Sequence, residues 1–172
     1  MTEMEIRPRR KTSRLKGYNY RTKGAYLATI CTQNRECRFG RIENGVMQLN
    51  GLGRIVEECI QGIPQHFPMV DVMAHVVMPN HVHLLLGLGL HDEDAGCPVI
   101  KYSLGEIINV FKGSVRRIYG SPVWQTRFYD HVIRGASDLL DTKERIKNNP
   151  AKWEEDKFFV GDELQDKDAE PL

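Results

Sequence analysis

The order of apolar and polar residues along the chain predicts several short strands. Five stretches are rich in β-branched and aromatic residues, which is typical of strands. They are residues 26–32, 39–49, 70–76, 81–86 and 123–133. Asn44-Gly45, in the middle of the second stretch, indicates a tight turn and therefore a hairpin. Pro79 separates the third stretch from the fourth, so these are expected to be two adjacent strands.

Apolar residues repeat with helical spacing in two other segments, residues 52–63 and 104–118. Both have apolar side chains at positions i, i+3, i+4 and i+7, the pattern of an amphipathic helix. Ser103 followed three residues later by Glu106 forms a capping box that marks the start of the second helix. A third helix is expected over residues 137–150, capped by its first residue, a serine, and closed by its last, a proline.

The order of these elements indicates the fold class. Apart from the hairpin, it is strand, helix, strand, strand, helix, strand, followed by one more helix. This is the order of the split βαβ unit. It predicts an α+β, ferredoxin-like βαββαβ fold: an antiparallel sheet with helices on one face, plus an added C-terminal helix.

Length and composition agree with one globular domain. The chain has 172 residues, of which 41% are hydrophobic, enough for a substantial core. It contains no apolar run near the ~18 residues of a membrane span and no signal-peptide pattern, which favours a cytoplasmic protein. Four cysteines, at positions 31, 37, 59 and 97, form no C-x-x-C pair and are expected to be reduced.

Charge is concentrated at the two ends of the chain. Residues 1–23 carry eight basic and two acidic side chains, whereas residues 154–172 carry eight acidic and two basic ones. We therefore divide the chain into a basic arm (1–24), a domain (25–153) and an acidic tail (154–172). Tyrosines 18, 20 and 26 lie among the basic residues, and cations with aromatic rings suit phosphates and stacked bases. A solvated tail is the alternative.

Two histidines on the fourth predicted strand are candidates for metal ligands. His81 and His83 are two residues apart, so both imidazoles emerge from one face of the sheet, while Val82 and Leu84 point to the core. Two imidazoles on a stiff strand can hold a divalent ion and leave coordination positions open for a substrate oxygen. A surface pair without metal is the alternative. His75 either shares this face or is hydrogen-bonded within the sheet.

Three segments in order resemble the single-tyrosine HUH transposases. The stretch Met78-Pro79-Asn80-His81-Val82-His83 is similar to the HUH segment, in which Val82 is the apolar residue between the histidines. The segment Trp124-Gln125-Thr126-Arg127-Phe128-Tyr129-Asp130-His131 resembles the late strand of the REP-associated tyrosine transposase branch, and Ile146-Lys147-Asn148-Asn149-Pro150 resembles the end of its last helix.

This resemblance implies a nuclease and strand transferase that acts on single-stranded DNA near hairpins, in DNA transposition. It implies Mg²⁺ or Mn²⁺ held by His81, His83 and Asn149 against the scissile phosphate. A tyrosine of the last helix would attack this phosphate and form a 5′-phosphotyrosine. The partner is then single-stranded or hairpin DNA, and the protein is a monomer or a homodimer.

The chain departs from this family at the position of the nucleophile. The family pattern places the tyrosine four residues before the ligand asparagine, and here Arg145 stands at that position. A guanidinium cannot be a nucleophile, but it can bind a phosphate. Tyr129 is a fallback nucleophile, with cross-strand packing as the alternative. Whether the chain is an enzyme is left open by these residues.

Two other functions are compatible with the sequence. One is a non-catalytic DNA-binding module derived from a transposase. The other is an RNA-recognition domain, a less well supported function because the required aromatic motif is missing from this sequence. The basic residues expected to bind DNA are Arg7, Arg9, Arg10, Lys11, Arg14, Lys16, Arg21, Lys23, Lys112, Arg116 and Arg117.

Overall fold

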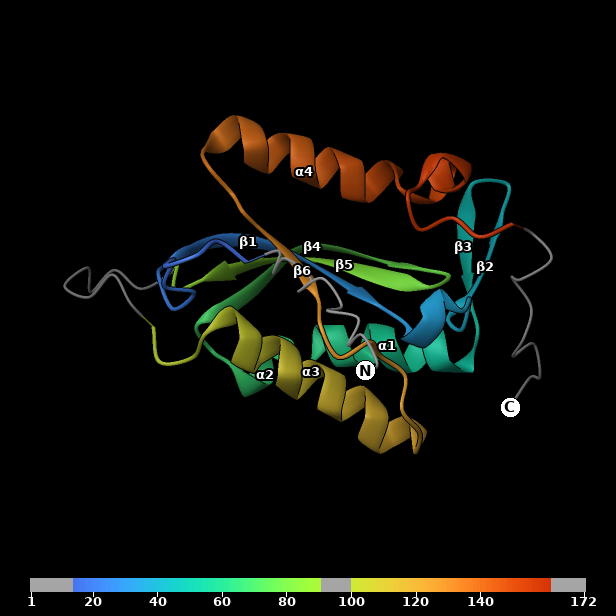
Figure 1. Cartoon of the computed structure of the whole chain (residues 1–172), viewed down its shortest axis with the longest axis horizontal. Coiled ribbons are helices and arrows are strands. Elements are labelled where there is room, and N and C mark those ends of the chain that lie inside the picture. Colours follow the sequence, from blue (N-terminus) through green and yellow to red (C-terminus); the bar gives the residue numbers. More distant parts are fainter. Residues whose placement is uncertain (1–13, 91–99, 162–172) are drawn as a thin grey trace, which may run out of the picture.

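A four-stranded antiparallel sheet forms the centre of the molecule (Figure 1). The computed structural model describes residues 14–90 and 100–161. The strands of the sheet are β1 (Gly24–Cys31), β4 (Val70–Met78), β5 (His81–Leu88) and β6 (Tyr129–Val132). Their order is β4-β5-β1-β6, and every neighbouring pair is antiparallel, as the sequence predicted.

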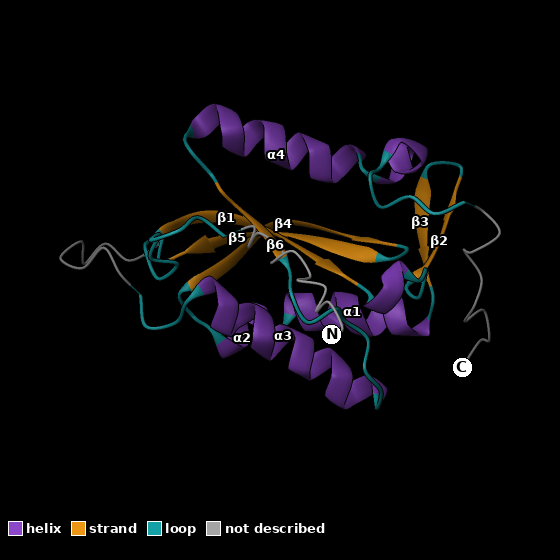
Figure 2. Ribbon diagram, in the orientation of Figure 1, coloured by secondary structure: helices purple, strands orange, loops and turns teal. Residues whose placement is uncertain are grey.

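Helices cover both faces of this sheet (Figure 2). The helices α1 (Gly51–Gln61) and α3 (Leu104–Tyr119) lie on one face, and α4 (Ala136–Asn148) lies on the other. The remaining elements are η1 (Gln33–Arg35), β2 (Gly40–Glu43), β3 (Val46–Leu49), α2 (Ile63–His66) and η2 (Pro150–Glu155). The ferredoxin-like order is confirmed, and the added helix closes the face that the other two leave open.

Local sequence signals explain where the two core helices begin and end. The Asn50 side chain accepts a hydrogen bond from the backbone N–H of Gly53 at the start of α1. Ser103 and Glu106 form the expected capping box at the start of α3. Gly120 ends α3 with φ at 86°, a left-handed conformation that favours glycine.

The main core lies between the sheet and helices α1 and α3. From β5 it takes the even-numbered residues, including Leu84 and Leu86, both fully buried. The face under α4 holds a smaller cluster formed by Leu27, Leu85 and Ile146. Because side chains alternate along a strand, neighbouring residues of β5 belong to different cores.

The hairpin is confirmed, and two other expectations are wrong in detail. Asn44 and Gly45 both have positive φ between β2 and β3, as a type I′ turn requires. The expected strand over 123–133 is reduced to β6 and an isolated antiparallel bridge between Thr32 and Trp124. Before it, the carbonyls of Gln125 and Thr126 accept hydrogen bonds from the Lys112 ammonium instead of from a strand.

The start of α4 also differs from the prediction. The cap position is Gly135, one residue before the helix, and it provides no side-chain cap. Ser137 lies inside the first turn, where Asp138 accepts a hydrogen bond from the backbone N–H of Arg134. Pro64 lies in the first turn of α2, where the N–H that proline lacks would have no helical partner.

Strand β4 contains an irregularity that sequence alternation could not show. Its register with β5 shifts between Val72 and Ala74, as in a β-bulge. After this shift, His75 faces α1, where its Nε2 lies 2.7 Å from Oε1 of Glu57. His75 is therefore a hydrogen-bonded sheet histidine on the face opposite His81 and His83.

Two properties of the described part of the chain agree with the composition. None of the helices in residues 14–90 and 100–161 combines the length and apolar character needed to cross a membrane. The cysteines at positions 31, 37 and 59 are free thiols. Burial raises the pKa of Cys31 and of Cys37 to about 11, so both are poorly reactive. Cys97 lies outside the described residues.

Candidate metal centre

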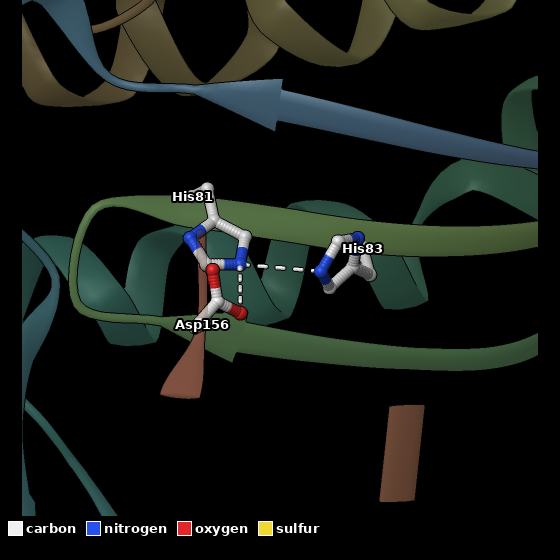
Figure 3. Close-up of side chains that lie close together, drawn as sticks. All are labelled: His81, His83 and Asp156. Carbon is white, nitrogen blue, oxygen red and sulfur yellow. Dashed lines mark hydrogen bonds and ion pairs between the residues drawn. The ribbon is translucent and has the colours of Figure 1, made fainter. Parts of the chain in front are cut away.

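The side-chain nitrogens of the two histidines of β5 converge (Figure 3). His83 lines the same cavity as Arg145 and Ile146 of α4, so both histidines lie on the face that α4 covers. His81 pairs with Cys31, and His83 with Thr29, in the register of β1 and β5. The Nε2 atoms of His81 and His83 are 3.2 Å apart. The prediction that both lie on the face opposite the core helices is confirmed, but this face is closed, and His81 is fully buried.

Asn80 fixes which nitrogen of His81 carries the proton. The Asn80 amide nitrogen donates to the backbone carbonyls of Arg35 and Phe158, so its oxygen must face His81. That oxygen lies 2.9 Å from Nδ1 of His81 and accepts a hydrogen bond from it. In the neutral imidazole, Nε2 therefore keeps its lone pair and is free to bind a cation.

Thr29 has the same role beside the second histidine. Its Oγ1 lies 2.8 Å from Nδ1 of His83, across the pair between β1 and β5. This hydrogen bond holds the ring with Nε2 pointing towards His81. Hydrogen bonds to the nitrogen that does not bind the metal orient a histidine ligand and set its basicity.

Asp156 brings a carboxylate to the two imidazoles. It follows η2, and its Oδ2 lies 3.7 Å from Nε2 of His81. One ligand atom each from His81, His83 and Asp156 lies within 4.8 Å of the others, a spacing that allows all three to hold one ion. The backbone N–H of Phe158 donates to the other oxygen, Oδ1, at 2.7 Å.

Asn149 contacts this carboxylate through a hydrogen bond. Its amide nitrogen donates to Oδ2 of Asp156 at 2.9 Å, so in this arrangement Asn149 orients Asp156. A direct contact between Asn149 and an ion stays a prediction. Residues 154–161, assigned from their charge to the tail, thus include a side chain of the candidate site.

Burial keeps both imidazoles neutral. The pKa of His81 is lowered well below its usual value, first by burial and then by the neighbouring His83 and Lys157. Burial also lowers the pKa of His83 to about 4, although Asp156 opposes this shift. Neutral imidazoles suit a cation, because a protonated ring offers no lone pair.

A cavity of about 610 Å³ adjoins the histidines. His83 and Asp156 lie in its wall, together with three cationic side chains: Arg145 of α4, Lys152 of η2 and Lys157. Carboxylates also line it, those of residues 141, 144 and 155. With Asp156 the wall holds four carboxylates and three cations, so the cavity becomes net positive, and suited to an anionic ligand, only when a divalent ion is bound.

The two residues considered for the nucleophile position lie on different elements. Arg145 is exposed on α4 and lines the cavity, as its position four residues before Asn149 predicted. Tyr129 lies on β6 opposite Thr29 and is 41% exposed. Its neighbour Asp130 accepts a hydrogen bond from Tyr20, while His131 is paired with Asp138, so Asp130 and His131 form no dyad.

The basic residues expected to bind DNA fall into three groups. Arg7, Arg9, Arg10 and Lys11 lie outside the described residues, and Lys16, Arg116 and Arg117 are exposed. Among the others, Arg14 lies over the ring of Phe128, and Arg21 pairs with Glu106. The Lys112 ammonium donates hydrogen bonds to the carbonyls of residues 125 and 126, and Lys23 is half-buried. Their role towards DNA stays a prediction.

The tyrosines of the arm contribute to the fold. Tyr26 is fully buried and donates its hydroxyl to the carbonyl of Thr22, so it is not available for stacking a base. Tyr18 and Tyr20 pack against the same core and against each other, with ring centroids 5.1 Å apart.

Sequence reasoning missed Asp156, Asn80 and Thr29. Asp156 was counted with an acidic run, and only the aromatic residues beside it, such as Phe158, signalled that this segment is packed. Asn80 directly precedes the first histidine. A polar residue next to an H-x-H pair was the available signal, since imidazole ligands need an orienting partner.

The site combines an H-x-H pair on a central strand of a ferredoxin-like sheet with a carboxylate that follows the last helices of the chain, as in the HUH segment that the sequence resembles. No family model matches the chain. An uncharacterized protein of Haemophilus influenzae is 38% identical over 168 residues, which cover 88% of this chain and 93% of that protein. A second protein of that organism, named a putative REP-associated tyrosine transposase, is 28% identical over 94 residues, covering 51% and 53%.

A solved structure has the same fold. It is described as a REP-associated tyrosine transposase bound to a REP hairpin, with a TM-score of 0.62 and 22% identity, and the match covers 82% of this chain and 74% of that one. The chain belongs to the same family as the uncharacterized H. influenzae protein, and it resembles the REP-associated tyrosine transposases in its fold and over about half of its sequence. It is a transposase-like protein whose helix α4 carries arginine in place of tyrosine.

Proposed function

We propose that this chain binds single-stranded or hairpin DNA and holds one backbone phosphate in the cavity beside a divalent cation. The observation that carries the proposal is the convergence of three donors on one point: Nε2 of His81, Nε2 of His83 and a carboxylate oxygen of Asp156. The family implies Mg²⁺ or Mn²⁺ at this position. When bound, the ion would neutralise charge on the phosphate and polarise its P–O bonds.

The donors fit such an ion in spacing and chemistry. Neighbouring ligands of an octahedral ion with bonds of about 2.1 Å are about 3.0 Å apart. The two imidazole nitrogens are 3.2 Å apart, and Asp156 Oδ2, at 3.7 Å from His81, needs only a small rotation. Two imidazoles and one carboxylate leave coordination positions for phosphate oxygens and water.

Three observations support DNA as the partner. The similar solved structure is described as bound to a hairpin. Arg145, Lys152 and Lys157 line the cavity beside the candidate metal centre, where they can neutralise a phosphodiester. The exposed cations of α3, Arg116 and Arg117, offer further contacts to the backbone of a longer strand.

Arg145 binds the phosphate in this proposal, where the family has a nucleophile. A guanidinium presents two parallel N–H donors to a phosphate but has no electron pair for attack at phosphorus. Helix α4 therefore supplies no covalent step. This observation favours a second candidate function as well, a DNA-binding protein without cleavage that occupies the target of an active relative.

Metal binding is tested on protein treated with a chelator and then titrated with Mn²⁺ alone. Free Mn²⁺ is followed by electron paramagnetic resonance. We expect one site in the unmodified chain and at least tenfold weaker binding in His83→Gln and Asp156→Asn. The matched control is His66→Gln, because His66 is exposed at the end of α2. Equal Mn²⁺ affinity in all four proteins would contradict the proposal.

DNA binding is tested by fluorescence anisotropy with a pool of hairpins that carry single-stranded flanks of random sequence. Mn²⁺ should tighten binding, and Arg145→Ala should weaken it about tenfold, since a hydrogen bond to a charged group contributes ~1.5–3 kcal/mol. Arg134→Ala, another exposed arginine, is the control. Failure of the hairpins to bind better than fully paired duplex DNA would contradict hairpin or single-strand recognition.

Replacing Arg145 with the family's tyrosine distinguishes a DNA-cleaving protein from a DNA-binding protein without cleavage. If the scaffold is otherwise intact, Arg145→Tyr should form covalent protein–DNA adducts with the same pool in Mn²⁺. An adduct in this variant and none in the unmodified chain would establish the non-catalytic function. No adduct in either protein would mean that the described centre cannot activate a phosphodiester.

A further inference from the structure

Tyr129 lies in line with the candidate metal centre. In the register of the sheet, Tyr129 of β6 is opposite Thr29 of β1, and Thr29 is opposite His83 of β5. Directly opposed residues share a face, so the three side chains form one row that faces α4. The outer two strands of this row are about 10 Å apart, twice the usual strand spacing, which leaves room for a phosphate between an ion at His83 and the phenol.

The hydroxyl of Tyr129 is free, in contrast to those of most other tyrosines. The chain has six tyrosines, and all lie in its described part. Four have hydrogen-bonded hydroxyl groups: Tyr18, Tyr20, Tyr26 and Tyr119. Neither Tyr129 nor Tyr102 has a hydrogen-bond partner for its hydroxyl among residues 14–90 and 100–161.

Of these two tyrosines, only Tyr129 lies near the candidate site: it is not in the wall of the cavity, but its ring contacts Phe158 and Lys157, which are. Tyr102 packs edge-on against Phe67, which belongs to the main core on the other face of the sheet. The ring of Tyr129 lies 6.0 Å from that of Phe158, which in turn lies 4.8 Å from that of His81. The ammonium of Lys157, which also lines the cavity, is 5.5 Å from the Tyr129 ring.

We propose that Tyr129 is the nucleophile of this chain, moved from helix α4 to strand β6. This inference rests on the proposed function, because it needs a phosphodiester bound beside His83. Tyr129 Oη attacks phosphorus and loses its proton to solvent, which its 41% exposure allows. The bond between phosphorus and the 3′ oxygen breaks, and that oxygen takes up a proton. The products are a 5′-phosphotyrosine and a free 3′-hydroxyl end.

The neighbouring cations have complementary roles in this step. Arg145 reaches the phosphate from α4, and Lys157 lies beside the attacking phenol. Both place positive charge where negative charge develops at phosphorus. Arginine at the family's tyrosine position is then a phosphate-binding residue of an active site whose nucleophile comes from the sheet.

The test uses the full chain with Mn²⁺ and the random-flank hairpin pool, labelled either at the 3′ or at the 5′ end. Because the downstream fragment is the one attached, the 3′ label should migrate with the protein on a denaturing gel. The 5′ label should appear in a shorter free strand. Mass spectrometry of the digested adduct should find the nucleotide on Tyr129. Tyr129→Phe should lose the adduct, and Tyr102→Phe should keep it.

Each other outcome overturns the inference in a distinguishable way. An adduct that persists in Tyr129→Phe places the nucleophile elsewhere. Shortened strands of both labels without protein attachment indicate attack by water. Binding of Mn²⁺ and DNA without an adduct, while Arg145→Tyr forms one, shows that the centre is competent but Tyr129 does not attack. Absence of Mn²⁺ and DNA binding contradicts the proposed function itself, and this inference with it.

Discussion

The two faces of the sheet differ in what they bury. The face under α1 and α3 is closed by a large apolar core that includes Leu84, Leu86 and Ile107. The face under α4 has two small apolar clusters, one of Leu27, Leu85 and Ile146 and one of Cys37, Met78 and Trp153, and beside them lie buried polar groups, among them His81 and Thr29. Stability is therefore concentrated on one face and the candidate chemistry on the other.

This difference has a structural consequence for α4. Only Thr142 and Ile146 of this helix are buried, whereas α3 buries five residues. Apolar burial contributes about 25 cal/mol per Å², so α4 is held far less firmly than α3.

Adjacent leucines of β5 offer the strongest test of the comparison. Leu84→Ala, in the main core, should lower the free energy of unfolding by about 3–4 kcal/mol, as large cavities in cores do. Leu85→Ala should cost about 2 kcal/mol, because its cluster is smaller, but it should weaken Mn²⁺ binding by loosening Ile146 and the helix that carries Asn149. Urea unfolding and Mn²⁺ titration measure the two effects. Equal costs with unchanged Mn²⁺ affinity would remove the distinction between the faces.

The sequence predicted the face under α1 and α3 well. Period-2 and period-3.6 patterns placed Leu84, Ile107 and Phe111 in the core, and the capping box fixed the start of α3. These features depend on a residue's neighbours in the chain, which is why they can be read from it. The bulge in β4 and the shortening of β6 could not, since both depend on contacts with distant elements, such as Lys112 with residues 125–126.

On the face under α4, the sequence predicted only the two histidines of the candidate site. His81 and His83 are close in sequence, and their common face follows from strand geometry. Asp156 lies more than 70 residues further on, and its position depends on the chain turning back after η2, which no local pattern encodes. The row of Tyr129, Thr29 and His83 likewise required the strand order, because β6 and β5 are not neighbours in the sheet.

Acid should destabilise the face under α4 selectively. The pKa of His83 is about 4 in the folded chain and near 6.5 when unfolded, so the unfolded state binds more protons between these values. The free energy of unfolding should therefore fall as pH decreases from 6.5 to 4, by up to about 3 kcal/mol from this residue. His81, whose pKa is also lowered, should add to the loss.

This prediction is measured by urea unfolding in the presence of a chelator at several pH values. His83→Gln should reduce the dependence between pH 6.5 and 4 to the part that His81 contributes, whereas Leu84→Ala should lower stability equally at every pH. If His83→Gln keeps the full slope, acid acts on another group, and His83 is not the vulnerable part of this face.

Asn149 allows the orientation of Asp156 to be tested separately from metal ligation. Asn149→Ala removes the hydrogen bond to Oδ2 of Asp156 and should weaken Mn²⁺ binding by about tenfold, the lower end of the usual effect of losing an orienting partner, and by less than Asp156→Asn does. Lys147→Ala, an exposed change on the same helix, should have no effect. Mn²⁺ binding that survives in Asn149→Ala but is lost in Asp156→Asn would identify Asp156 as the ligand. Equal loss in both would instead favour Asn149 as a direct ligand.

Removing the capping box of α3 should have the smallest effect on stability. It also tests whether a change on the face under α1 and α3 leaves the candidate metal centre on the other face unaffected. Ser103→Ala removes the acceptor for the backbone N–H of Glu106 and should cost about 1 kcal/mol of stability. Because α3 does not contact the candidate metal centre, and Ser103 lies at the opposite end of α3 from Arg116 and Arg117, Mn²⁺ affinity and hairpin binding should stay unchanged in the folded protein. A change in either would mean that the two faces are coupled through the sheet, and that the position of His83 depends on how firmly the helices below it are held.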